Sequence, residues 1–210
     1  VQQVRRQKIF LTCLFLLIVG CILLRFSKFS GRQKETHQIN AACEAYRDEV
    51  SSEAAQYDMS DYVDLILAVM MQESSGQGTD PMQSSEGAYN TRYPQQPNGI
   101  TDPSYSISCG IQELKYALEK AVCTGPTDLS KIRLALQAYN FGADSYFAYL
   151  EENGQTVWTA QSAQAFAQMA SGGTQRDEDD PLHDPAGPWD YGDQYYPDHV
   201  LRYYHLDNNS

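Results

Sequence analysis

The sequence predicts an all-α domain that follows a single N-terminal transmembrane helix. Three observations lead to this prediction. Apolar residues recur with the helical period of 3.6 from residue 40 onward, no convincing strand pattern occurs, and an uncharged apolar stretch lies near the N-terminus. The chain has 210 residues, of which 42% are hydrophobic and 11% aromatic, enough to form one folded core.

The apolar stretch runs from Ile9 to Leu24 without a charged residue. A transmembrane helix needs about 17–25 apolar residues, and the stretch reaches this length if Phe26 is added and Arg25 snorkels. We therefore expect a basic cytoplasmic tail at 1–8, a transmembrane anchor at 9–26, a linker at 27–39 and an extracellular domain at 40–210. Basic residues flank both ends, so the orientation rests on the short tail rather than on charge.

A lipoprotein is the alternative interpretation of the same stretch. Ile18-Val19-Gly20-Cys21 resembles the bacterial lipoprotein box, in which the cysteine is lipidated after cleavage. The residues after Cys21 remain apolar and no Ala-x-Ala site follows. These features favour an uncleaved single-pass anchor in the cell membrane.

The charge is distributed unevenly. The chain carries 15 basic and 27 acidic residues, for a net charge of −12. Seven of the basic residues precede position 35 and no acidic residue does, so the remainder carries a net charge of −19. Such an acidic domain is a poor binder of phosphate backbones, which excludes nucleic acid as the main partner.

The first two helices follow from apolar spacing. The spacing predicts one helix over 41–57, with Ala42, Tyr46, Val50 and Ala54 on one face. Ser60 is the expected N-cap of the next helix, which ends at Ser74-Ser75-Gly76. The polar stretch 76–104 is expected to be a loop.

Four further helices follow this loop. They are expected at about 105–122, after an N-cap at Thr127, near 143–152, and from Thr159 to Gly172-Gly173. Residues 174–194 are acidic and rich in Pro and Gly, so we expect a loop there. Pro197 suits the first turn of a last helix.

Cysteines and acidic residues give no firm metal or disulfide site. A disulfide between Cys109 and Cys123 and two free thiols are equally compatible with the sequence. The run 177–180 with His183 and Asp184 lacks the alternating ligands and central glycine of a calcium loop. We expect no metal and no cofactor.

Glu73 is unusual because of its position. It ends an apolar helix, where both the helix dipole and the apolar neighbours disfavour a negative charge. Both effects raise the pKa of a carboxyl group, and a general acid needs a proton that is retained near neutral pH. Glu73 is therefore the first catalytic candidate, although a structural glutamate at an exposed helix end would give the same pattern.

Three motifs occur in the order known from one group of enzymes. The segments 72–76 (Gln-Glu-Ser-Ser-Gly), 108–112 (Ser-Cys-Gly-Ile-Gln) and 139–142 (Tyr-Asn-Phe-Gly) resemble the three motifs of goose-type lysozymes and soluble lytic transglycosylases. A nearer resemblance, over residues 40–206, is to the lysozyme-like muramidase domain of bifunctional cell-wall hydrolases of Gram-positive conjugative transposons. Shared segments include 80–86, 191–193 and 199–204.

This resemblance implies a lysozyme-like helical fold and roles for individual residues. Glu73 would protonate the oxygen between MurNAc and GlcNAc in peptidoglycan. Asp80 would be the second carboxylate, acting on water or on the transition state, and Glu86 is its weaker rival. The implied substrate-binding residues are Gln83, Ser84, Ser85, Gln112, Tyr139 and Asn140.

The leading hypothesis is thus a membrane-anchored muramidase that acts on glycan strands outside the cell. A lytic transglycosylase, which gives 1,6-anhydro-MurNAc without water, is the first alternative and would not need Asp80. A non-catalytic wall scaffold of a conjugation or secretion apparatus is the second. Partnership with such an apparatus rests on family analogy alone.

Overall fold

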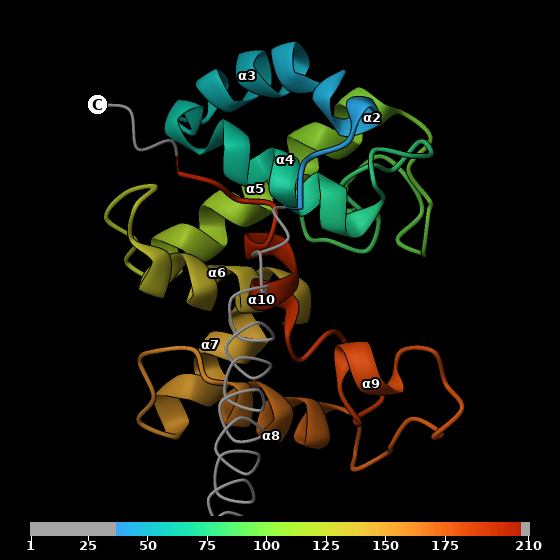
Figure 1. Cartoon of the computed structure of the whole chain (residues 1–210), viewed down its shortest axis with the longest axis vertical. Helices are drawn as coiled ribbons and strands as arrows, with labels where there is room; N and C mark the ends of the chain where they lie inside the picture. Colours follow the sequence, from blue (N-terminus) through green and yellow to red (C-terminus); the bar gives the residue numbers. More distant parts are fainter. Residues whose placement is uncertain (1–36, 207–210) are drawn as a thin grey trace, which may run out of the picture. The chain divides into compact units, whose positions relative to one another are not determined.

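The computed structural model describes residues 37–206, and their regular structure is helical apart from one isolated bridge between Gln175 and Trp189. Among them, residues 38–206 belong to one compact unit. Its helices, labelled in Figure 1, are α2 (Ala41–Glu44), α3 (Arg47–Gln56), a 3-10 turn (Ser60–Tyr62), α4 (Val63–Glu73), α5 (Pro103–Lys120), α6 (Leu129–Phe141), α7 (Ala143–Glu152), α8 (Ala160–Ala170), α9 (His183–Ala186) and α10 (Tyr196–Leu201).

The expected tail and anchor, with most of the linker, lie outside the described residues. Within 37–206, none of the helices combines the length and the apolar character needed to span a bilayer.

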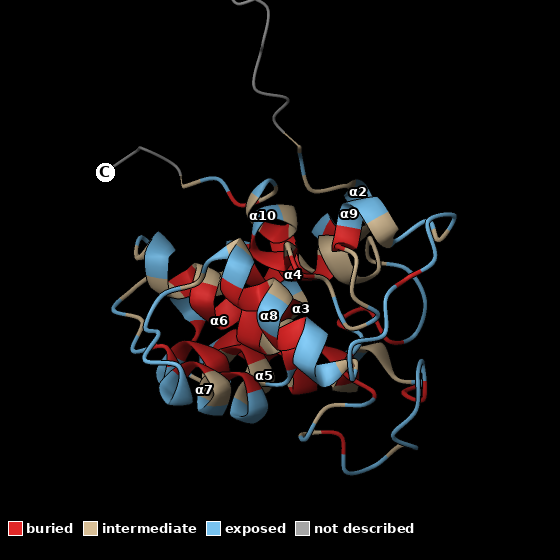
Figure 2. Cartoon of the chain, turned by 90° about the horizontal axis from the view of Figure 1, so that it is seen from below, coloured by how far each residue is buried: buried red, intermediate tan, exposed pale blue. Residues whose placement is uncertain are grey.

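Helix α4 forms the centre of the core. Leu65 to Met70 are all buried, and a helix that is apolar all round belongs inside a protein. Helix α3 packs on α4 and α5, α5 on α6, and α10 on both α4 and α6. Figure 2 shows the buried residues gathered where these helices face one another. The end of α4 is therefore held by elements from both halves of the chain.

The start of the domain differs from the expected single helix. The helix over 41–57 is divided into α2 and α3, because the N–H of Tyr46 bonds to Cys43 in a three-residue turn before α-helical bonding resumes at Val50. Ser60 is not an α-helix N-cap. It is the first residue of the 3-10 turn, and the residue that precedes α4 is Tyr62, which makes no side-chain capping bond.

The later helix boundaries agree more closely. Helix α5 begins two residues early, at Pro103 after an Asp102 cap. Asp128, rather than Thr127, caps α6 by accepting from Lys131. Thr159 caps α8 as predicted, in a capping box with Ser162.

The expected loop over 174–194 is more ordered than the sequence suggested. It contains the short helix α9, and the guanidinium of Arg176 donates to the carbonyls of Gly187 and Gly192. These bonds fix the segment that leads into α10. Cys109 and Cys123 are both free thiols.

Gly76 shapes the turn after α4. Its φ is +73°, and a Cβ there would lie 2.7 Å from the Cys43 nitrogen and 2.9 Å from the Ala42 carbonyl carbon. We expect Gly76→Ala to lower the free energy of unfolding by about 3 kcal/mol, from backbone strain and overpacking together. Gly78 is the matched control, because its φ is +78° and no atom lies within 4 Å of its Cβ position. Gly78→Ala should cost about 1–2 kcal/mol from strain alone. Equal losses in chemical denaturation would contradict the close contact.

Candidate active site

Glu73 is the last residue of α4, at the surface end of the buried central helix. The helix stops there because Ser74 leaves the helical region, with φ −142°, and Ser75 and Gly76 take positive φ values. The residue as a whole is half-buried. A rigid apolar helix thus presents one carboxyl group at its end.

Ser74 fastens this helix end to the following loop. Its hydroxyl donates to the carbonyl of Pro81 at 2.8 Å and accepts the N–H of Gly76 at 3.1 Å. The serine of the Glu-Ser motif therefore has a structural explanation. It holds the loop that carries Asp80 next to Glu73.

Tyr196 is the hydrogen-bond partner of Glu73. Its hydroxyl donates to Glu73 Oε1 from helix α10, 123 residues further along the chain. The Tyr196 ring stacks on Tyr139, with 6.3 Å between ring centroids, and the Tyr139 hydroxyl donates to the Met82 carbonyl at 3.0 Å. The two tyrosines connect α10, α6 and the loop around Glu73.

The surroundings of Glu73 disfavour its ionised form. Burial is the main cause that raises the pKa of Glu73 from 4.5 to about 7. The bond from Tyr196 opposes this by stabilising the carboxylate, whereas the negative charges of Asp193, Asp80 and Glu113 raise the pKa further. A carboxyl group with such a pKa retains a proton near neutral pH, as a general acid requires.

Asp193 lies in a segment that docks on α6. Asn140 Oδ1 accepts its N–H at 2.8 Å, and the Gln137 amide donates to its carbonyl at 2.8 Å. Its carboxylate Oδ2 lies 2.5 Å from Nδ1 of His199 on α10. Asn140 therefore positions the 191–193 segment.

Asp80 is enclosed by hydrogen-bond donors. It is 1% exposed, and its oxygens accept the N–H groups of Ser84 at 3.0 Å and Ser85 at 3.1 Å. The hydroxyls of Ser106, at 2.6 Å, and of Ser85 also donate to it. This is how a buried carboxylate organises a loop. Its catalytic role stays a prediction.

The neighbouring loop residues support the same arrangement. Ser84 and Ser85 are buried, and the Ser85 hydroxyl also accepts the N–H of Ile100 at 2.9 Å. Gln83 is exposed, with φ +50°, and its amide donates to the carbonyl of Asp80 and to Asn98. Of these three residues, Gln83 alone has an exposed side chain, and their substrate-binding roles stay predictions.

The other sequence-derived candidates fall in two places. Tyr139 and Asn140 join the Glu73 surroundings through Tyr196 and Asp193. Gln112 instead lines a separate pocket between α3, α5 and the loop, where its amide donates to the Ser108 carbonyl at 3.1 Å. No group of three His, Cys, Asp or Glu residues within 37–206 is arranged to hold a metal ion.

Tyr196, Asp193 and Glu113 were not assigned roles from the sequence. Asp193 and the last residues of α10 lie in the shared segments 191–193 and 199–204. Tyr196 lies between these segments, is one of 15 tyrosines and had no distinguishing signal. Glu113 directly follows Gln112, and burial is the main cause that raises its pKa to about 7.

The chain is similar to known proteins over most of its length. The lysozyme-like family matches residues 41–204. The bifunctional muramidase/DL-endopeptidase CwlT of Bacillus subtilis is 35% identical over 169 residues, which cover 80% of this chain and 44% of CwlT. The uncharacterized membrane protein YocA of the same organism is 40% identical over 115 residues, 53% of this chain and 45% of YocA.

A solved structure extends the comparison to the fold. A Staphylococcus aureus protein described as similar to a lipoprotein of the NLP/P60 family superposes with a TM-score of 0.67 at 27% identity. The match covers 83% of this chain and 56% of that one. The chain spans about half the length of the curated relatives it matches.

Proposed function

Because the chain belongs to the lysozyme-like family, we propose that it cleaves the MurNAc–GlcNAc bond of peptidoglycan by hydrolysis, with Glu73 as the general acid. The observation that carries the proposal is the Glu73 carboxyl group, which ends a buried helix, accepts from Tyr196 and has a pKa of about 7. The similarity to a bifunctional muramidase supports the choice of bond.

The proposed reaction follows the chemistry of glycosidases. Glu73 gives its proton to the glycosidic oxygen while the bond from that oxygen to C1 of MurNAc breaks, and positive charge develops at the sugar ring. Water then adds to C1, and the proton it releases restores Glu73 for the next cycle. The products are a reducing-end MurNAc and a free hydroxyl on GlcNAc.

A lytic transglycosylase is the second candidate, and the enclosure of Asp80 favours it. With four donors on its oxygens, Asp80 has little capacity left to take a proton from water. In transglycosylation the 6-hydroxyl of MurNAc attacks C1 in place of water, and its proton goes to Glu73. The product is 1,6-anhydro-MurNAc, and no second carboxylate is needed.

Product analysis tests the proposal. The full chain is incubated with purified peptidoglycan, and the soluble fragments are analysed by mass spectrometry with and without borohydride reduction. Reducing-end MurNAc supports hydrolysis, and anhydro-MurNAc supports the transglycosylase. The absence of any cleaved glycan from an enzyme that is folded by circular dichroism would overturn both.

We further propose that the stretch 9–26 anchors the domain at the outer face of the cell membrane, close to its substrate. The description of YocA as a membrane protein supports this placement. Local opening of the wall for a conjugation or secretion apparatus is the use that the resemblance to transposon-borne hydrolases suggests.

The pH dependence of cleavage should follow Glu73. The protonated form is the active one, so the rate should fall as the pH rises through about 7. The Tyr196 bond lowers the pKa of Glu73, so Tyr196→Phe should move this fall to higher pH. Initial rates of glycan cleavage from pH 5 to 9, for wild type and variant, measure both effects. A shift to lower pH in the variant would show that the hydroxyl does not stabilise the carboxylate.

A further inference from the structure

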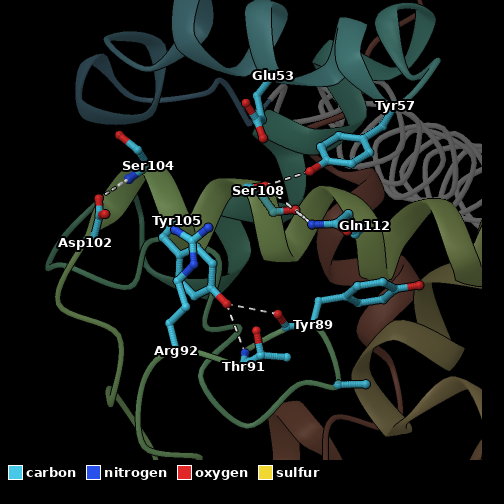
Figure 3. Close-up of a pocket in the computed structure, with 11 residues that line it drawn as sticks. Glu53, Tyr57, Tyr89, Thr91, Arg92, Asp102, Ser104, Tyr105, Ser108 and Gln112 are labelled. Atoms are coloured by element: carbon cyan, nitrogen blue, oxygen red, sulfur yellow. Dashed lines mark hydrogen bonds between the residues drawn. The ribbon is translucent and has the colours of Figure 1, made fainter.

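A pocket lies between α3, α5 and the loop that joins α4 to α5 (Figure 3). Its volume is about 610 Å³, within the range of ligand sites in proteins. None of the residues that surround the Glu73 carboxyl group lines it. The lining of the pocket is therefore distinct from the residues around the candidate catalytic group.

The lining carries charges of both signs. Arg92 comes from the loop, Glu53 from α3 and Asp102 from the start of α5. Figure 3 shows Glu53 on the α3 wall and Arg92 on the loop wall, with α5 between them. Tyr57 and Ser108, whose hydroxyls lie 3.0 Å apart, form one more side.

These charged groups retain capacity for a ligand. Among the described residues, the Arg92 guanidinium makes no ion pair or hydrogen bond, and it stacks over the Tyr105 ring at 4.6 Å from the centroid. Within the described part of the chain, Glu53 accepts a hydrogen bond only from Gln56, through Oε2. Asp102 uses Oδ1 to cap α5 at the Ser104 N–H, which leaves Oδ2 available. The stacking fixes the plane of the guanidinium with its N–H edge free for a carboxylate.

We propose that this pocket binds a short peptide that carries both an ammonium and a carboxylate group. Arg92 takes the carboxylate, and Glu53 and Asp102 take the ammonium. Because peptidoglycan bears such peptides on MurNAc, the inference rests on the proposed function and names the stem peptide as the second part of the substrate. A neutral sugar would form no ion pair with any of the three charged groups.

The experiment measures binding, not cleavage, so it is independent of Glu73. The full chain is titrated by calorimetry with a stem tetrapeptide that has a free side-chain amine and a free C-terminal carboxylate. Three further probes are the amine-acetylated peptide, the C-terminal amide and the peptide-free GlcNAc–MurNAc disaccharide. We expect the tetrapeptide to bind and each blocked peptide to bind more weakly.

Variants test which side chain binds the carboxylate and which side chains bind the ammonium group. Arg92→Gln should weaken tetrapeptide binding about tenfold, because a charge-assisted pair is lost. Glu53→Gln and Asp102→Asn should each weaken it about three- to fivefold. Asp102→Asn is a matched change, since asparagine caps a helix as well as aspartate does and only the charge is removed. Glu152→Gln, an exposed change outside the pocket, is the control and should bind as the wild type does.

The decisive measurement is whether each variant loses the discrimination between the free and the blocked peptide. The Arg92 variant should not discriminate between the free carboxylate and the amide, and the Glu53 variant should discriminate less between the free and acetylated amine. Additive effects, or disaccharide binding that matches tetrapeptide binding, would overturn the proposal. Peptide binding without glycan cleavage would leave the pocket in place and remove the proposed function. Cleavage without peptide binding would do the reverse.

Discussion

The Glu73→Gln variant should cleave peptidoglycan about 10²–10⁴-fold more slowly than the wild type, because general acid catalysis contributes that much to a rate. Glutamine keeps the length of the side chain, and its carbonyl oxygen can still accept the Tyr196 hydroxyl. It has no proton to give to the leaving glycosidic oxygen. Release of soluble muropeptides at pH 6, where the wild-type acid is protonated, measures the loss.

The stability of this variant separates catalysis from structure. The pKa of Glu73 is 4.5 in the unfolded chain and about 7 in the folded one. The folded state therefore holds a proton that the unfolded chain releases between these values, and the contribution of Glu73 to stability falls as the pH rises through this window. Glutamine does not titrate. Glu73→Gln should be at least as stable as the wild type at pH 8, with a smaller advantage at pH 5.

A control variant and unfolding measurements separate a loss of catalysis from a loss of folding. Glu152→Gln removes one exposed acidic group on α7 and should retain full activity. Thermal unfolding of wild type and both variants at pH 5 and pH 8 gives the stability comparison. Activity in Glu73→Gln within tenfold of the wild type, with both proteins folded at the assay pH, would remove Glu73 as the general acid.

The fold could be predicted where each helix carries its own signal. The end of α4 before Ser74-Ser75-Gly76, the Thr159 cap of α8 and the bounds of α7 are local features, and the structure confirms them. The break at Tyr46 was missed because the spacing of apolar residues continues across it. The break is visible only in the backbone hydrogen bonds, because the N–H of Tyr46 bonds to the carbonyl three residues back instead of four.

The two long loops have a defined structure that could not be predicted, and the reason is different. Residues 76–104 contain no periodic pattern, and a single buried carboxylate, Asp80, holds part of them in place through contacts up to 26 residues away. Segment 174–194 is held by Arg176 through carbonyl groups. Backbone acceptors leave no trace in a sequence.

The candidate site also contains residues that the sequence could identify and contacts that only the fold reveals. Glu73 was found because its neighbours in the chain already make it unusual. Tyr196 contacts it across 123 residues, and such a pair becomes visible only when α10 packs on α4. Conversely, Asp80 has the residue type and position of a second catalytic carboxylate, and only its four donors show the structural role.

Asp80→Asn should lower the free energy of unfolding by about 2–4 kcal/mol, the second large effect that the structure implies. An asparagine oxygen can keep the bonds from Ser84 and Ser106, but its NH2 group would face the N–H of Ser85. Two buried donors then oppose each other and lose their acceptor. Urea denaturation measures the loss, and Asp58→Asn, at an exposed turn, should be near neutral apart from its local backbone preference.

The rate per folded molecule then decides what Asp80 does in the reaction. If Asp80 positions the loop, Asp80→Asn should keep this rate within about tenfold of the wild type once the folded fraction is corrected. Ser106→Ala, which removes one donor and leaves the carboxylate, should then show a smaller loss of the same kind. If Asp80 activates water, Asp80→Asn should lose about 10²-fold or more while Ser106→Ala stays near the wild type.

The enclosure of Asp80 leads us to expect the first result, measured well below the midpoint of unfolding of each variant. With reducing-end MurNAc as the product, that result would require hydrolysis in which Glu73 alone handles both protons, because the loop carboxylate would be excluded as the base. With anhydro-MurNAc it would complete the case for transglycosylation. A loss of 10²-fold would instead mean that the loop opens around Asp80 when the glycan binds, and the four bonds from Ser84, Ser85 and Ser106 would then be the contacts that must break.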